Sequence, residues 1–308
     1  MGTSGRRSYT PSLTLAELQA RAADRTLQAE YESETQAILR DALREYNDRD
    51  VASIHQHLDT IGSAISRYLD EGSVDLLFGG SVAKHTYVNG LSDADMLACL
   101  NDTSLEGKSP AEVLEYFKSV LRQRLPRTEI KVGDLAVTVK FSDGHEIQIV
   151  PAVRTARGFR IADPDTGNWS NVIAPHGFAR KLTAINQQLG RRVVPVIKLA
   201  KAITSSLPKP LRLSGYHIES LAIEAFEKYS GQRTYREMTR HFWQFAQTQV
   251  LRSIVDSTGQ SRHVDDYLGG VNSAARKRVS HAIGRIVARI DAAEAMRSTD
   301  IWQEMLEI

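Results

Sequence analysis

The chain has 308 residues, of which 42% are hydrophobic and 25% charged, and its formal net charge is +2. This composition is typical of a globular protein, and the near-neutral charge argues against a dedicated binder of duplex nucleic acid. The apolar runs are too short to cross a bilayer, so we expect no membrane association. The single cysteine, Cys99, excludes an internal disulfide and indicates a reducing, cytoplasmic location.

The N-terminal half reads as helices followed by strands. Residues 1–12 are small, polar and basic, without an apolar signal-peptide core, and predict a disordered lead-in. Apolar residues at steps of three and four predict helices within residues 13–69. Apolar runs then predict strands at 74–78 and 95–100, a Ser-Pro pair at 109–110 starts a helix, and further strands are expected at 129–132, 135–141 and 146–150. Asp143-Gly144 predicts a tight hairpin between the last two strands.

The C-terminal half reads as helical. Residues 158–173 are rich in turn residues and predict a connecting loop, and two prolines predict another loop at 206–212. Helices are expected at 177–189, 194–205, 217–229, 235–258 and 272–293. The predicted fold class is therefore α+β. A small mixed sheet with helices occupies residues 13–157, a helical lobe occupies 158–308, and the cleft between them is the expected active site.

The most informative motif is a glycine turn followed by paired carboxylates. Gly79-Gly80-Ser81 ends the first predicted strand, and Asp93 and Asp95 border the second. On an extended strand, residues i and i+2 point to the same side, so the two Asp side chains would offer oxygen ligands to one Mg²⁺ ion. Glycine lets backbone amides approach phosphate oxygens, and the Ser81 hydroxyl adds a donor. A phosphate cradle beside paired carboxylates is typical of metal-dependent nucleotidyl transfer.

The stretch from Gly79 to Leu97 resembles the nucleotidyltransferase motif of the polymerase-beta-like superfamily. More narrowly, it is similar to the bacterial CD-NTases (the SMODS type), relatives of animal cyclic GMP-AMP synthase and of the oligoadenylate synthases. The resemblance implies that Ser81, beside Gly80, holds substrate phosphates and that Asp93 and Asp95 bind catalytic Mg²⁺, with Mn²⁺ as an alternative. It also implies a C-terminal lobe resembling the second domain of oligoadenylate synthase.

A third metal-binding carboxylate is a further implication of the resemblance. Many relatives place an Asp three residues before a proline of a later strand, and here Gln148 stands at that position before Pro151. A neutral amide can coordinate a metal through its carbonyl oxygen, but it cannot neutralise a second cation. Glu146 points to the same side of the strand, so we expect Glu146 as third ligand and base, ahead of Gln148 acting alone. The alternative is a weakened transferase or a nucleotide-binding relic.

Phosphate- and base-binding residues are expected in the C-terminal half. The apolar run that ends in Lys201 resembles a family helix with a phosphate-binding lysine, with Lys198 as second choice. Ser214 and Tyr216 resemble a family Ser-Tyr-His stretch in which Ser contacts the triphosphate and Tyr stacks on a base, although Gly215 is inserted here. Residues 166–218 contain no Asp or Glu and eight basic residues, which indicates a positive wall facing a triphosphate: Arg180, Lys181, Arg191, Arg192, Lys198, Lys201, Lys209 and Arg212.

These features predict an enzyme that joins nucleoside triphosphates without a template and releases pyrophosphate. The resemblance implies a cyclic or short oligonucleotide second messenger in bacterial antiphage defence. It also implies a downstream effector that responds to the product and a regulatory or effector protein of the same defence system. The alternatives are linear RNA or DNA oligomers, nucleotide transfer to tRNA or protein, and a catalytically weak nucleotide sensor.

Overall fold

The computed structural model describes most of the chain, and all structural statements refer to this part: residues 13–47, 51–67, 74–88, 94–101, 105, 107–163, 166–173, 175–256 and 263–307. The expected lead-in at residues 1–12 lies outside it. None of the helices in the described part of the chain has the length and apolar character needed to span a bilayer.

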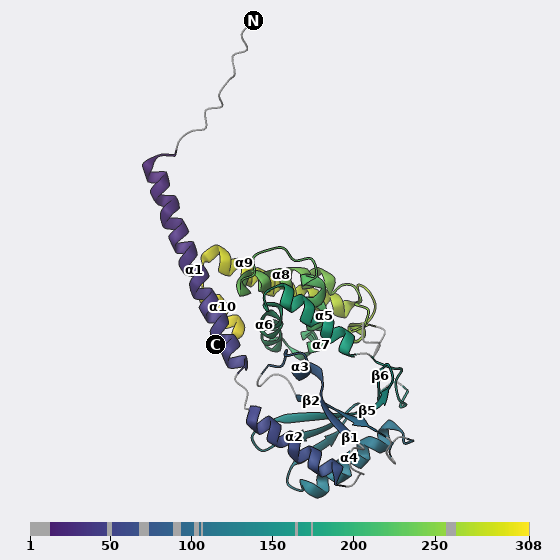
Figure 1. The fold of residues 1–308 in the computed structure, drawn as a ribbon. Helices are drawn as coiled ribbons and strands as arrows, with labels where there is room; N and C mark the ends of the chain where they lie inside the picture. The colour runs from purple at the N-terminus through teal and green to yellow at the C-terminus, as the bar shows by residue number, and fades with distance from the viewer. Residues whose placement is uncertain are drawn as a thin grey trace.

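Six strands of the described chain form one mixed sheet (Figure 1). β1 (Val74–Phe78), β2 (Ala94–Leu100), β5 (Glu146–Thr155), β4 (Val137–Lys140) and β3 (Glu129–Val132) follow one another across it, and β6 (Gly158–Ile161) pairs with β5. The central pair β2–β5 is parallel and the other pairs are antiparallel. The register places Asp95 of β2 directly opposite Gln148 of β5.

The sheet divides its side chains between two faces because strand residues alternate. One face packs against α2 (Val51–Ser66) and α4 (Pro110–Arg124) and buries Met96, Ala98, Leu100, Ile147 and Ile149. α4 begins with a capping box, in which Ser109 accepts from the Glu112 backbone and Glu112 accepts from the Ser109 backbone. The opposite face buries Cys99 and Ala152, with Leu97 and Val150 packed against them. Asp95 and Gln148 lie two residues before Leu97 and Val150, respectively, so their side chains belong to this second face.

The helical lobe consists of segments from both ends of the described chain. Its helices are α1 (Leu15–Asn47), α5 (Pro175–Gln188), α6 (Val193–Ser205), α7 (Gly215–Phe226), α8 (Tyr235–Gln249), α9 (Ala274–Met296) and α10 (Asp300–Leu306). Short helical turns occur at Gly80–Ala83 (α3), Lys209–Leu211 and Asp266–Leu268. The C-terminal half of α1 lies along this lobe, whereas its N-terminal half projects beyond it (Figure 1).

Hydrogen bonds tie α1 to the two final helices. The Tyr31 hydroxyl accepts from the Trp302 indole at 3.1 Å and donates to Glu294 at 3.1 Å. The Tyr46 hydroxyl donates to the Leu306 carbonyl at 3.3 Å. Tyr31, Leu39 and Tyr46 of α1 therefore belong to the same buried cluster as the C-terminal helices.

The secondary structure agrees with the prediction in most elements, but β5 continues to Thr155 instead of ending at 150, and several other elements differ. Residues 158–161 form β6 within the expected loop, the helix at 235 ends at Gln249 instead of 258, the proline loop contains a 3₁₀ turn, and α10 was not predicted. The three buried clusters also do not follow the expected division at 157/158. β6 extends the sheet beyond it, and α1 packs in the C-terminal lobe.

Candidate active site

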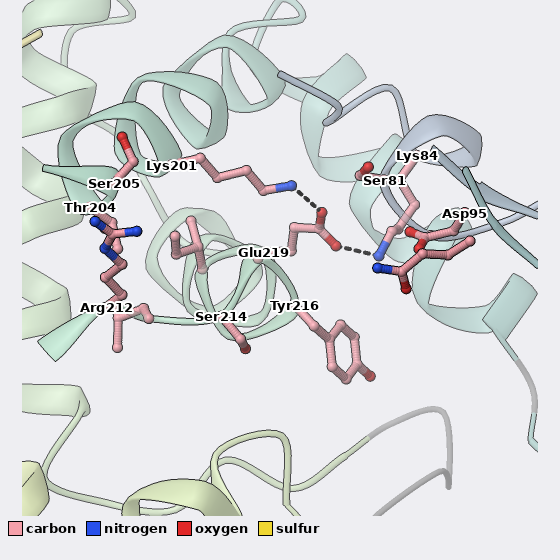
Figure 2. A pocket seen from close by; sticks show the side chains of 15 residues that line it. Ser81, Lys84, Asp95, Lys201, Thr204, Ser205, Arg212, Ser214, Tyr216 and Glu219 are labelled. Atoms are coloured by element: carbon pink, nitrogen blue, oxygen red, sulfur yellow. Dashed lines mark hydrogen bonds and ion pairs between the residues drawn. The ribbon is translucent and has the colours of Figure 1, made fainter. Parts of the chain in front are cut away.

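A cavity of about 620 Å³ lies where the sheet meets the helical lobe (Figure 2). α3 and the strands β2 and β5 supply one side of it, and α6, α7 and the segment before α7 supply the other. The lining residues are Gly80, Ser81, Lys84, Asp95, Gln148, Lys201, Thr204, Ser205, Arg212, Leu213, Ser214, Gly215, Tyr216, Ile218 and Glu219.

The glycine turn and Asp95 form one unit at this cavity. The Gly79 amide donates to the Asp95 carbonyl at 2.9 Å, which holds the turn against β2. Gly80 has φ +48°, and a Cβ placed there would lie 1.6 Å from Asp95 Oδ2. Only glycine combines this backbone angle with so close an approach to the carboxylate. The turn therefore fixes where the Asp95 carboxylate lies.

Ser81 is held beside the carboxylate by the loop that follows it. Its carbonyl accepts from the amides of Thr86 and Tyr87 at 2.9 and 3.1 Å. Its Oγ is buried and has no hydrogen-bond partner among the described residues. A buried hydroxyl without a partner is costly, so a ligand oxygen at this position would complete its hydrogen bonding.

The position next to Asp95 belongs to Gln148, not to Glu146. Gln148 is the direct register partner of Asp95 and lines the cavity. Glu146 does not line the cavity, and its carboxylate pairs with Lys140 of β4 at 2.7 Å. This placement differs from the expected order of the two candidates, because the β2–β5 register sets Gln148 opposite Asp95. Asp93 lies outside the described residues.

Lys201 is buried in an ion network at the cavity wall. Its ammonium donates to the Thr86 carbonyl and to Glu219, each at 2.9 Å. Lys84 also pairs with Glu219, whose carboxylate lies between the two lysines in Figure 2. Burial disfavours the charged form of Glu219, but Lys84 and Lys201 outweigh burial and lower the pKa of that carboxyl. Burial also lowers the pKa of Lys201, against the opposing effect of Glu219.

The other predicted basic residues are dispersed. Lys198 is buried on α6, donates to Asn47 of α1 and does not line the cavity. Lys181 pairs with Glu227, and Arg192 lies over the Tyr235 ring. Of the eight basic residues in 166–218, only Lys201 and Arg212 line the cavity, so the sequence run does not form one continuous wall.

Ser214 and Tyr216 meet the cavity at the start of α7. Ser214 caps the helix by accepting from the His217 amide. The Tyr216 ring packs against Phe178, with centroids 4.9 Å apart, and its hydroxyl donates to Asp256 at 2.7 Å. The Lys84 ammonium lies 5.2 Å from the Phe178 ring centroid and 5.3 Å from that of Tyr216. An aromatic ring with a nearby cation therefore lines the cavity.

Residues 263–269 contact the start of α7 and hold it in place. The Tyr267 hydroxyl accepts from the Ser214 amide at 3.1 Å and lies 2.9 Å from His217 Nδ1. Asp265 is buried against Arg276. Burial lowers the pKa of His217 to about 4, so this imidazole is neutral at neutral pH.

The sequence offers Lys84 as a candidate phosphate contact, but the prediction omitted Glu219, and both residues line the cavity. A signal for Glu219 was present, because it is an acidic residue within the apolar, buried run of α7. Its pairing with Lys84, 135 positions away in the sequence, has no local signal.

The family model named Second Messenger Oligonucleotide or Dinucleotide Synthetase domain (SMODS) matches residues 31–186, about half of the chain. The chain belongs to this family. The match covers the glycine turn, Asp95 and Gln148, and it confirms the predicted nucleotidyltransferase of the bacterial CD-NTase type, an enzyme of second-messenger nucleotide synthesis. A search of curated protein sequences found no match.

Solved structures of CD-NTases share the fold of this SMODS protein at low sequence identity. CdnC of E. coli MS115-1, solved with ATP, has a TM-score of 0.69 at 18% identity over 89% of this chain and 96% of CdnC, and it has also been solved in a complex with HORMA-deltaN. CdnG of Bradyrhizobium diazoefficiens, solved with GTP, has a TM-score of 0.65 at 14% identity over 89% and 98%. The Vibrio cholerae cyclic AMP-GMP synthase DncV, solved with the linear intermediate 5′ pppA(3′,5′)pG, has a TM-score of 0.61 at 11% identity over 96% and 89%.

Proposed function

We propose that this SMODS enzyme binds magnesium–nucleoside triphosphate in the cavity and joins a ribose 3′-oxygen to an α-phosphate, with loss of pyrophosphate. Repetition on the product gives a short oligonucleotide, and closure of its ends gives a cyclic second messenger. The observation that carries this proposal is the contact between Gly80 and the Asp95 carboxylate, beside the unpartnered hydroxyl of Ser81.

The described donors fit a divalent cation. Asp95 offers carboxylate oxygens and Gln148 an amide oxygen from adjacent strands on the same face, and Mg²⁺ takes oxygen ligands of this kind. We assign Asp95, together with Asp93, to hold the metal, with Gln148 as a neutral ligand in place of Glu146. A bound divalent cation would favour ionisation of the 3′-hydroxyl and stabilise charge on the leaving group, and Mn²⁺ has the same ligand preference.

The remaining cavity residues would hold the nucleotide. Ser81 would donate its free hydroxyl to a phosphate oxygen. Lys84 and Lys201 supply positive charge at the cavity, and both pair with the carboxylate of Glu219. Phosphate oxygens would replace part of the contact that Lys84 makes with Glu219. Tyr216 would present its ring to a base, since every base has a face that can stack on an aromatic ring.

The family and its solved members indicate which partners this chain would bind. CdnC has been solved in a complex with HORMA-deltaN, which supports a regulatory protein partner for this chain. DncV binds a linear dinucleotide intermediate, which supports stepwise synthesis here. A second messenger acts through a receptor, so we propose a separate effector, in cytoplasmic antiphage defence.

Product analysis tests the proposal. The purified chain is incubated with each labelled NTP and dNTP, with Mg²⁺ or Mn²⁺, and the products are treated with phosphatase. A phosphatase-resistant product dependent on metal is the expected result, and a ladder of phosphatase-sensitive products would indicate linear synthesis instead. Asp95→Asn should abolish the product while the far-ultraviolet circular dichroism stays unchanged. Tight NTP binding without any product would refute catalysis and indicate a sensor.

A further inference from the structure

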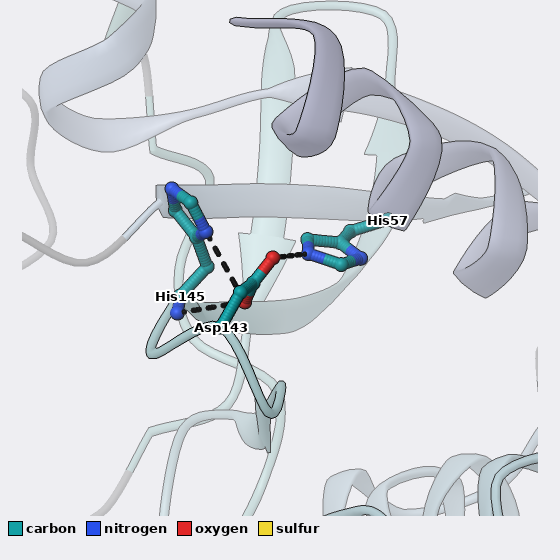
Figure 3. A group of neighbouring side chains, drawn as sticks. All are labelled: His57, Asp143 and His145. Atoms are coloured by element: carbon teal, nitrogen blue, oxygen red, sulfur yellow. Dashed lines mark hydrogen bonds and ion pairs between the residues drawn. The ribbon is translucent and has the colours of Figure 1, made fainter. Parts of the chain in front are cut away.

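A second group of metal-ligating side chains lies outside the cavity, where α2 meets the β4–β5 hairpin (Figure 3). His57 comes from α2, and Asp143 and His145 come from the hairpin. One ligand atom of each residue can be chosen so that all three lie within 4.8 Å of one another. None of these residues lines the nucleotide cavity.

The hairpin fixes the Asp143 carboxylate. The chain reverses through a turn in which the Phe141 amide donates to the His145 carbonyl at 2.9 Å and Gly144 has φ +92°. Asp143 Oδ1 accepts from the His145 amide at 3.1 Å, an Asx turn that orients the carboxylate toward the His145 ring. The second oxygen, Oδ2, is therefore directed to α2 and lies 2.6 Å from His57 Nε2.

The two imidazoles are also oriented within the protein. The His57 ring stacks on Phe141, with centroids 3.6 Å apart and an interplanar angle of 15°. His145 Nδ1 is buried and lies 3.2 Å from Asp143 Oδ1, without the alignment of a hydrogen bond. A buried ring nitrogen that faces a carboxylate in this way is positioned to give its lone pair to a cation between them.

Two imidazoles and one carboxylate form a donor set that Zn²⁺ accepts, commonly with water as fourth ligand. Zinc–ligand bonds of about 2.0–2.2 Å in a tetrahedron separate the ligand atoms by roughly 3.3 Å. The 3.2 Å between His145 Nδ1 and Asp143 Oδ1 already meets this requirement. The 2.6 Å contact between His57 Nε2 and Asp143 Oδ2 would have to lengthen.

We propose that His57 Nε2, His145 Nδ1 and the Asp143 carboxylate form a zinc-binding site that joins α2 to the β4–β5 hairpin. The site is separate from the magnesium chemistry proposed for the cavity, because imidazole nitrogen favours zinc and Mg²⁺ prefers oxygen. β5 begins one residue after His145 and carries Gln148 on the opposite face of the sheet. Zinc would therefore restrain the strand that supplies the register partner of Asp95.

Metal retention tests the site. The full chain is dialysed with limiting Zn²⁺ in excess Mg²⁺, and zinc is counted by mass spectrometry and its affinity measured by competition with a chromophoric chelator. One zinc per wild-type chain is expected. His57→Ala and His145→Ala should each weaken binding by at least about 10–100-fold, the loss typical of removing even an outer-shell partner. The matched control is His281→Ala, which removes an exposed histidine of α9, and Asp95→Asn tests whether the cavity binds the zinc.

The outcomes separate the alternatives. Absence of retained zinc in the wild type, or equal retention in His57→Ala, His145→Ala and the control, overturns the proposal. Loss of zinc in Asp95→Asn alone would assign the ion to the cavity and likewise overturn it. Zinc-edge X-ray absorption of the wild-type protein needs no variant, and scattering from two imidazole ligands is the expected result. A spectrum without imidazole scattering contradicts the site even if the histidine variants fail to fold.

Discussion

Alanine at Gly80 would act directly on the position of the Asp95 carboxylate. The added Cβ would lie 1.6 Å from Oδ2, about 1.8 Å short of the 3.4 Å at which ordinary contact begins. The carboxylate must therefore move, or the turn must open. A displacement of about 1 Å at reacting groups can cost about 100-fold in rate, which corresponds to about 2.7 kcal/mol in the activation free energy. We expect pyrophosphate release by Gly80→Ala to fall by at least this factor.

Two other glycines provide matched controls. Gly79 has φ −114°, and its added Cβ would approach no atom closer than 3.4 Å, so Gly79→Ala should lose far less activity. Gly190 has φ +67° and open space around it, so Gly190→Ala has the left-handed strain without a collision. That strain costs about 1–2 kcal/mol of unfolding free energy, and we expect a similar loss from the same source in Gly80→Ala.

Initial rates of pyrophosphate release and urea unfolding, measured on the three variants, separate the two effects. Gly80→Ala should be the only one of the three with a large loss of rate. If it turns over as fast as Gly79→Ala, or if Gly190→Ala is equally impaired, the contact between Gly80 and Asp95 does not position the carboxylate as argued.

Three further predictions concern the cavity and its support. Gln148→Ala should reduce kcat more than Glu146→Gln, and the reverse order in steady-state rates would restore Glu146 as the third ligand. Glu219→Gln removes the charge that both lysines share, so urea unfolding should show a loss of about 3 kcal/mol, and an unchanged midpoint would contradict that pairing. Burial lowers the pKa of His217 from 6.5 to about 4, so the unfolded chain binds a proton that the folded chain rejects between these values. The contribution of His217 to stability is complete above pH 6.5 and is lost as pH falls toward 4, so a His217→Asn variant should show a flatter decline than wild type between about pH 7 and about pH 5.

Local pattern was sufficient to predict most elements of this fold. The run 74–78 forms β1 with the predicted bounds, and the Ser-Pro-Ala-Glu sequence starts α4 where its capping chemistry requires. Residues 158–161 were missed because their strand pairing depends on β5, not on their own turn-rich sequence. The end of α8 at Gln249 was missed because helical periodicity continues past it in the sequence.

The candidate site was predictable where its residues are close in sequence. Gly80, Ser81 and Asp95 lie within sixteen consecutive residues, and the structure brings them together at one cavity. The choice between Glu146 and Gln148 depends on the register between β2 and β5, which the sequence of one strand does not specify. Lys198 and Lys201 share a helix, but only the surrounding lobe decides that one contacts α1 and the other the cavity.

The packing of α1 against the final helices affects how the protein folds during synthesis. The Tyr31–Trp302 hydrogen bond joins positions 271 residues apart, so a ribosome would release α1 long before its partner exists. Until then Tyr31, Leu39 and Leu43 lack the α10 side of their core, and α1 can pack only against helices made earlier, which include α6, α8 and α9. Closing so long a loop is slow relative to local helix formation. The nascent chain would therefore complete the core of its helical lobe late, and chains interrupted before residue 300 would expose the apolar side of α1 to chaperones or proteases.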